Sequence, residues 1–266
     1  MSPVLAAGRF TRSAALRAGY TVHLLIDTAL AVPYLPCRFR FTLDAAYAAG
    51  VRAMPVNAVV AMFAGMILAL QTGIELQRFG QSDLIGQVVA LSMCREMGPF
   101  MTAIILAATV GSAIAAEIGT MTVSDEVTAL DVMSIDPTNY LVLPRVVALT
   151  VMCPVVAVFS DAIGIAGGSL VAQMHLGIPP RNYWQEVQIA LTSTEWLLPK
   201  DVYVGLFKAL VFGCTIAVVS CSSGLRASGG ALGVGRAVQH AVMSSIILII
   251  VFGYVITWLF YFLPNG

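Results

Sequence analysis

The 266-residue sequence contains little charge. Only 11% of its residues are Asp, Glu, Lys or Arg, against about 25% in a typical soluble domain, and 59% are hydrophobic. The 14 basic and 14 acidic residues cancel, so the chain lacks the basic excess of a nucleic-acid-binding protein. So few charges suit neither the surface of a soluble enzyme nor a disordered chain. The composition predicts an all-α polytopic membrane protein.

Several chemical signatures are also missing. The five cysteines form no CxxC pair and the three histidines form no HxxxH or HExxH pair, so we expect no metal site. The P-loop pattern GxxxxGK[ST] is absent, and no spacing indicates a nucleophile with its base. We therefore expect no catalytic residues and no cofactor in this chain. The first 20 residues lack the continuous apolar core of a cleavable signal peptide.

Residues 1–50 predict an N-terminal interfacial segment, distinct from a transmembrane domain over 51–266. Arginines are scattered through this segment, and Leu16, Tyr20 and Leu24 recur at helical spacing. This pattern fits an amphipathic helix, or a pair of helices, lying on the membrane surface. A partly disordered tail is the alternative.

Five apolar stretches reach the length of about 20 residues that a membrane span needs. They lie at about 55–74, within 84–116, and at about 141–174, 202–222 and 238–263. The second stretch is too long for one simple span and contains Arg95, Glu96 and the pair Gly98-Pro99 in its middle. Because proline disrupts a helix, we expect a break or bend at that point.

The distribution of Lys and Arg orients the chain. With the N-terminus inside, nine of the 14 basic residues are cytoplasmic, three are outside and two lie in apolar stretches. The positive-inside rule therefore predicts a cytoplasmic N-terminus and, after five spans, a C-terminus on the outside. The acidic connection 117–140 is then cytoplasmic, and the spacing of Val123, Val127 and Leu130 predicts a short amphipathic helix within it.

Four charged residues fall within the apolar stretches: Arg95, Glu96, Asp161 and Lys208. Each costs about 2.5–3.5 kcal/mol to insert, so such residues face a bundle interior or a wet cavity. Gln71 is a weaker polar candidate. Two interpretations stay open. The charges line a substrate path, or an ion pair of Arg95 or Lys208 with Glu96 or Asp161 fixes helix packing; a pair lining a cavity can do both.

Several ordered motifs resemble a known family. They are REMGP at 95–99, VGSAIAAEIGTM at 110–121, ALDVM at 129–133, and the pairs Asp136-Pro137 and Pro144-Arg145. In these motifs, and over about residues 45–260, the chain resembles the MlaE/YrbE family of ABC-transporter permeases, which work with MCE proteins in lipid transport.

This resemblance implies a subunit with an N-terminal interfacial helix and about five spans in the bacterial inner membrane. It implies movement of phospholipid or a related lipid between the inner and outer membranes. The implied partners are a second permease copy, a cytoplasmic ABC ATPase dimer that binds ATP and Mg, and a periplasmic MCE-domain protein, with a STAS-domain accessory protein as an optional subunit. A non-transporting scaffold for MCE proteins, and an ion-coupled secondary transporter using Glu96 and Asp161, are the alternatives.

The resemblance also assigns residues. The family's lipid-facing polar residues match Gln71, Arg95, Glu96 and Lys208, and Asp161 matches a structural or lipid-path position. In the last span Gly253 stands where an Asp is common in the family. The loss of that carboxylate predicts a different lipid or a different pairing of charges.

The family's ATPase-docking helix matches residues 117–133. The candidate coupling residues there are the acidic ones: Glu117, Asp125, Glu126 and Asp131.

Overall fold

The computed structural model describes residues 18–31, 33, 39–192 and 200–262. These ranges are mostly helical, with short turns between the helices, and contain no strand. Within them, five helical runs are long and apolar enough to cross a membrane: Arg40–Arg78, Ser82–Val123, Thr138–Leu176, Lys200–Gly224 and Gly230–Phe262. Each contains or overlaps one of the five predicted stretches, which confirms the all-α polytopic prediction. The helical runs are longer than the predicted stretches, because several helices extend beyond their apolar parts into polar residues.

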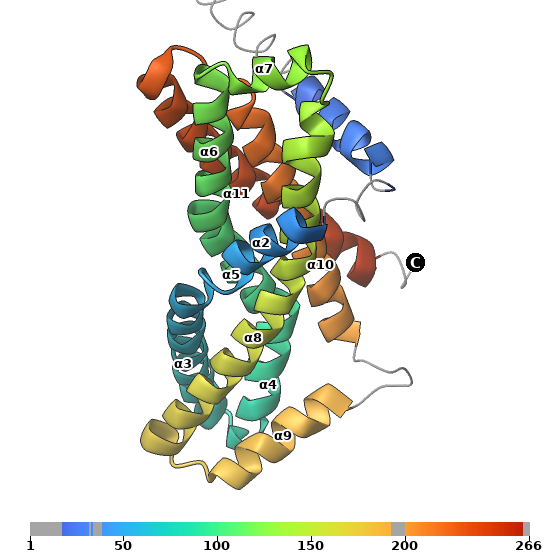
Figure 1. Ribbon diagram of the computed structural model, residues 1–266. Coiled ribbons are helices and arrows are strands. Elements are labelled where there is room, and N and C mark those ends of the chain that lie inside the picture. Colours follow the sequence, from blue (N-terminus) through green and yellow to red (C-terminus); the bar gives the residue numbers. More distant parts are fainter. Residues whose placement is uncertain (1–17, 32, 34–38, 193–199, 263–266) are drawn as a thin grey trace, which may run out of the picture.

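The spans form an elongated bundle (Figure 1). The long helix α8 (Leu143–Leu176) runs along most of its length. The short helix α7 (Glu126–Val132) lies at one end and α9 (Pro180–Thr192) at the other. The connection after the second span and the connection after the third therefore lie at opposite ends, as the alternating topology of a membrane protein requires.

The second span stays helical where a break or bend was predicted, with a local irregularity at that point. It consists of α4 (Ile85–Ser92), α5 (Gly98–Leu106) and α6 (Ser112–Val123), joined by π-helical turns at Met93–Met97 and Ala107–Gly111. In the first π turn the Gly98 N–H donates to the Met93 carbonyl, five residues earlier. The wider turn absorbs the irregularity at Gly98-Pro99 without ending the helix.

The first and third spans approach each other closely. Helix α3 (Met54–Arg78) lies along α8, with Gly65 against the backbone of Gly164. A Cβ at Gly167 would lie 2.6 Å from the Met62 carbonyl oxygen. Glycines at such contacts permit backbone approach that larger side chains would prevent. Pro154 lies inside α8, which remains one helix.

Two helices precede α3, one at residues 18–31 and α2 (Phe39–Gly50). The prediction was one helix or a pair of helices, and the described residues form the pair, while residues 1–17 lie outside the described part. Helix α2 ends with Gly50 against Met152 of α8, and its side chains Phe41, Leu43 and Tyr47 are exposed. Its position on the membrane surface and the boundary at residue 50 stay predictions.

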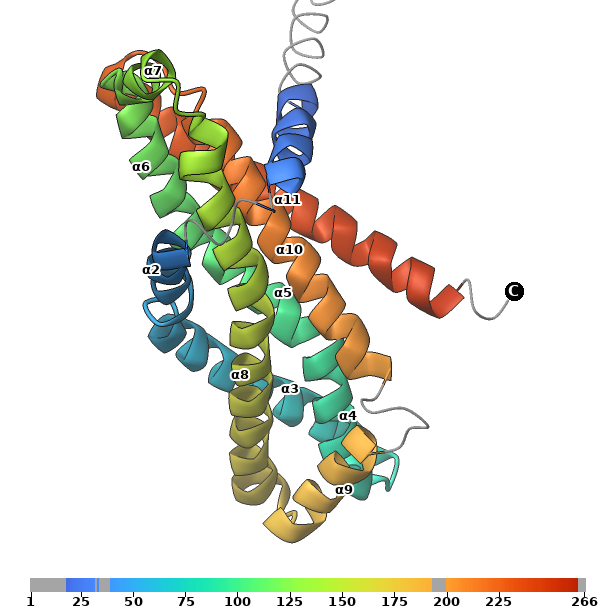
Figure 2. The same ribbon diagram turned by 45° about the vertical axis from the view of Figure 1, so that its right-hand side comes forward.

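Helix α10 (Lys200–Gly224) packs inside the bundle, whereas α11 (Gly230–Phe262) is the least buried span. In Figure 2 the C-terminal part of α11 projects to one side of the bundle, and Thr257 and Tyr261 in this part still contact the second span. Helix α11 begins at Gly230, which has a positive φ of 68°, and so starts before the predicted fifth stretch at about residue 238.

Candidate functional site

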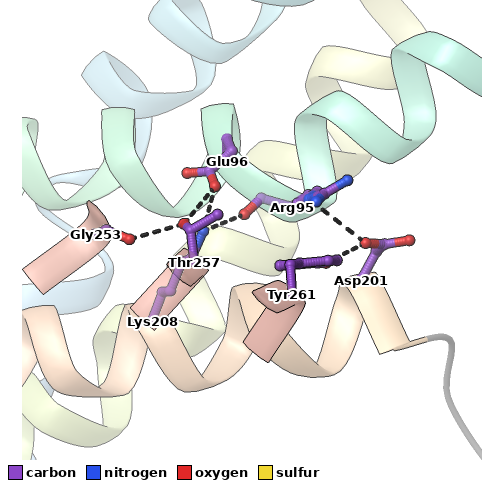
Figure 3. Close-up of polar contacts among 7 residues, drawn as sticks. All are labelled: Arg95, Glu96, Asp201, Lys208, Gly253, Thr257 and Tyr261. Atoms are coloured by element: carbon purple, nitrogen blue, oxygen red, sulfur yellow. Dashed lines mark hydrogen bonds and ion pairs between the residues drawn. The ribbon is translucent and has the colours of Figure 1, made fainter. Parts of the chain in front are cut away.

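The buried ammonium of Lys208 is the centre of a polar cluster (Figure 3). The Lys208 side chain on α10 is only 1% exposed, and its Nζ lies 2.5 Å from Oε1 of Glu96. It also donates to the Arg95 carbonyl oxygen at 3.1 Å. Glu96 is 45% exposed. A buried positive charge is tolerable only with such partners, and the half-exposed carboxylate opens the cluster to its surroundings.

The Arg95 carbonyl is available to Lys208 because of Pro99. In an α-helix this carbonyl would accept the N–H of the residue four positions later, and that residue is a proline without an N–H. Lys208 supplies the missing donor from a neighbouring helix. The π turn and the proline thus create the acceptor that holds the lysine.

Gly205 lets α10 come close enough for this contact. It precedes Lys208 by about one turn and faces the Cys94 carbonyl, which a Cβ at this position would overlap. The approach of α10 therefore depends on two features, the absent side chain of Gly205 and the exposed carbonyls of the π turn.

Helix α11 adds a hydroxyl to the cluster. The Thr257 Oγ1 lies 2.8 Å from Glu96 Oε1 and 2.8 Å from the Gly253 carbonyl oxygen, and its single proton serves these two acceptors. The structure thus pairs Lys208 with Glu96 without a carboxylate at position 253. The last span contributes a neutral donor one turn after the glycine.

Arg95 pairs with residues that the sequence analysis missed. Its Nε lies 3.7 Å from Oδ1 of Asp201, and its guanidinium lies 3.6 Å from the ring centroid of Tyr261. The Tyr261 hydroxyl donates to the same Asp201 oxygen. Asp201 precedes Lys208 by seven residues, two helical turns, and this shared helix face was the signal that could have revealed it.

Asp161 does not take part in either ion pair, so the proposed pairing of Asp161 with Arg95 or Lys208 is wrong. Its Oδ1 is buried and has no hydrogen-bond partner within the described part of the chain. This carboxylate lies against Gly98, where a Cβ would collide with it. The physical reason is that α8 packs on the Gly98 side of the second span, while α10 packs on the side of the π-turn carbonyls.

Gln71 lies apart from these ion pairs and lines an apolar groove of about 400 Å³ between α3 and α5. Phe63, Ile67 and Met97 belong to the same lining. Because Met97 directly follows Glu96, the groove begins next to the charged cluster.

A comparison with known families decides what kind of protein carries this site. The family model described as Permease MlaE matches residues 42–259. The chain belongs to the MlaE permease family.

Relatives of this MlaE-family chain agree with the match. A probable ABC transporter permease protein of Rickettsia prowazekii is 44% identical over 213 residues, covering 80% of each chain. The chloroplastic protein TRIGALACTOSYLDIACYLGLYCEROL 1 of Arabidopsis thaliana is 34% identical over 224 residues, covering 84% of this chain and 62% of that one. The intermembrane phospholipid transport system permease protein MlaE of Haemophilus influenzae is 29% identical over 241 residues, covering 91% of this chain and 89% of the relative.

The candidate coupling residues of this MlaE-family permease lie at the opposite end from α9. The short predicted helix exists as α7, but the assignment of Glu117 to the same connector is wrong, because α6 continues to Val123. Glu117 instead pairs with Arg145 of α8 at 3.1 Å.

Around α7 the acidic residues are exposed. Asp125 precedes the helix with a positive φ of 60°, and Glu126 is its first residue. Asp131, Val132 and Met133 are exposed at its end. The exposed surface of α7 is therefore both acidic and apolar. Among the residues that the structure describes, no group of three or more His, Cys, Asp or Glu could hold a metal ion.

Proposed function

We propose that this chain is the permease subunit of an ABC transporter that moves phospholipid or a related lipid between the inner and outer bacterial membranes. Family membership and the phospholipid-transport name of the Haemophilus relative support this proposal. The observation that carries it is the buried Lys208, with Glu96 and Arg95, beside an apolar groove of about 400 Å³.

This arrangement suits both parts of a phospholipid. Arg95 is 39% exposed and Glu96 is 45% exposed, so both can still meet a ligand. A guanidinium binds a phosphodiester through several N–H donors, while the carboxylate matches the ammonium of a zwitterionic headgroup. The groove lined by Gln71 and apolar side chains would take part of an acyl chain.

The energy for transport comes from a partner in this proposal. A cytoplasmic ABC ATPase dimer would bind ATP and Mg and dock on α7 through Asp125, Glu126 and Asp131. A second permease copy would complete the lipid cavity, and a periplasmic MCE-domain protein would continue the lipid path, with a STAS-domain protein as an optional subunit. The N-terminus would then be cytoplasmic and the C-terminus periplasmic.

The lipid site is tested by transport in reconstituted complexes. Glu96→Ala and Lys208→Ala are each expected to lower lipid transport at least tenfold, because each leaves the other charge without its partner. Arg78→Ala is the matched control, because Arg78 pairs with Glu75 through exposed side chains. If both cluster variants transport lipid at the wild-type rate, the site assignment is wrong.

ATPase docking is tested by co-purification. Asp125→Lys and Glu126→Lys are expected to reduce the amount of ATPase retained with the permease by several-fold, because they reverse two exposed charges near the start of α7. Asp83→Lys, an exposed acidic position at the opposite end, is the control. Equal retention by all three variants would refute docking at α7.

A further inference from the structure

A second pocket lies far from the polar cluster, between α2, α6 and α8. It has a volume of about 190 Å³ and is lined by residues of these helices and of the turns beside them. Thr109, at its edge, follows Glu96 by 13 residues along the second span, a rise of about 20 Å. The pocket is therefore separate from the proposed lipid-transport site.

The charges lining the pocket favour an anion. Arg52, Arg145 and Glu117 are the charged residues of the lining. Arg145 donates to Glu117 Oε2 at 3.1 Å and to the Leu141 carbonyl at 2.9 Å, so this arginine and glutamate neutralise each other. Arg52 has no ion pair or hydrogen bond through its side chain in the described part of the chain. One guanidinium is left to bind a ligand, and guanidinium groups bind phosphate through paired N–H donors.

The uncharged walls are small and apolar. Ala45, Ala48 and Ala49 of α2 face the pocket, and Ile114 and Leu149 close its other side. A water takes up about 30 Å³ of liquid volume, so about 190 Å³ holds several waters or one phosphate group with adjoining glycerol carbons. Apolar walls around the guanidinium of Arg52 match the part of a phospholipid where the phosphate of the headgroup joins the acyl chains.

The surroundings point to a lipid of the membrane rather than to free phosphate. On the side of α2 away from the pocket, Leu43 and Tyr47 are each more than half exposed. Arg52 stands between this helix and α3, the first membrane span. Basic residues at such junctions meet the anionic headgroups of the membrane surface.

We propose that the pocket between α2, α6 and α8 binds the headgroup of an anionic phospholipid from the leaflet in which α2 lies, with Arg52 contacting its phosphate. This lipid would join α2 to the bundle and would not be transported. This binding requires only the membrane and this chain, so its test does not depend on whether the transport proposal is correct.

The test is photo-crosslinking of the full-length protein in nanodiscs. A phosphatidylglycerol with a photoreactive group near its glycerol is expected to label peptides of α2 or α6, while the matching phosphatidylcholine labels them at least tenfold less. Arg52→Gln is expected to remove most of the phosphatidylglycerol labelling. Ala48→Leu fills the pocket without changing charge, and it is expected to have the same effect.

Arg40→Gln is the matched control, because Arg40 is an exposed arginine of α2 that does not line the pocket. It is expected to keep wild-type labelling. Equal labelling by both lipids, full labelling of Arg52→Gln or Ala48→Leu, or equal loss in Arg40→Gln would overturn the proposal. Complete competition by millimolar inorganic phosphate would show a site for free anions and would also overturn it.

Discussion

The ion pair between Lys208 and Glu96 is asymmetric, and this asymmetry predicts unequal effects of removing each partner. Lys208 is 1% exposed, whereas Glu96 is 45% exposed and also accepts from Thr257. After Lys208→Met, the carboxylate keeps Thr257 and gains water, so we expect a loss of about 1 kcal/mol in the free energy of unfolding. After Glu96→Met, the buried ammonium keeps only the Arg95 carbonyl, and we expect a loss of about 3 kcal/mol.

The double variant separates the interaction from the individual side chains. With both members of the pair replaced by methionine, neither leaves the other as an unpaired charge, so we expect a combined loss of about 2 kcal/mol and a coupling of about 2 kcal/mol between the two positions. The exposed pair Glu75 and Arg78, with side chains 59% and 69% exposed, is the control. Its coupling is expected to stay below about 1 kcal/mol.

The assay is unfolding of the purified protein in mixed micelles, followed with a thiol-reactive dye. Cys153 and Cys221 are fully buried and become reactive only when the bundle opens. Equal losses for the two single variants, or a coupling no larger than that of the exposed control pair, would refute the reasoning about the buried lysine.

Three further predictions concern the supports of this cluster. Pro99→Ala restores a main-chain N–H that competes with Lys208 for the Arg95 carbonyl. We therefore expect lipid transport to fall several-fold, while the free energy of unfolding changes by only about 1 kcal/mol. Unchanged transport would contradict this prediction. Gly205→Leu is expected to destabilise the protein by about 3 kcal/mol or more, because the leucine side chain would collide with the backbone at Cys94. An unfolding midpoint equal to that of the wild type would exclude this close contact. Tyr261→Phe removes a hydrogen bond and keeps the stacking on the guanidinium, so we expect about 1 kcal/mol of lost stability in the same unfolding assay; a loss no smaller than that of Tyr261→Ala would indicate that the ring contact is unimportant.

The spans were predictable because a membrane helix is defined mainly by the length of its apolar run. The partners within the membrane were not, because pairing depends on which face of one helix meets another. Lys208 and Glu96 were both recognised, yet Asp201 was missed, since it lies just before the predicted stretch 202–222, whereas α10 already begins at Lys200. The pairing of Asp161 with Arg95 or Lys208 stayed open in the sequence analysis, because sequence position does not show that α8 packs on the Gly98 side of the second span.

The end of the second span shows a different limit. Glu117 was read as the start of a polar connection, because it follows the last long apolar run. The helix nevertheless continues to Val123, and the carboxylate is paired with Arg145. A charged residue near a membrane surface therefore does not mark a helix end when a neighbouring helix offers it a partner.

The π turn also makes two distant positions dependent on each other. Pro99 leaves a carbonyl without its main-chain donor, and Lys208 would be an unsatisfied buried charge without acceptors of this kind. Each residue thus compensates for a defect that the other would cause alone. During divergence, neither is expected to change first without a cost, so relatives that lose the lysine should tend to have replaced the proline as well.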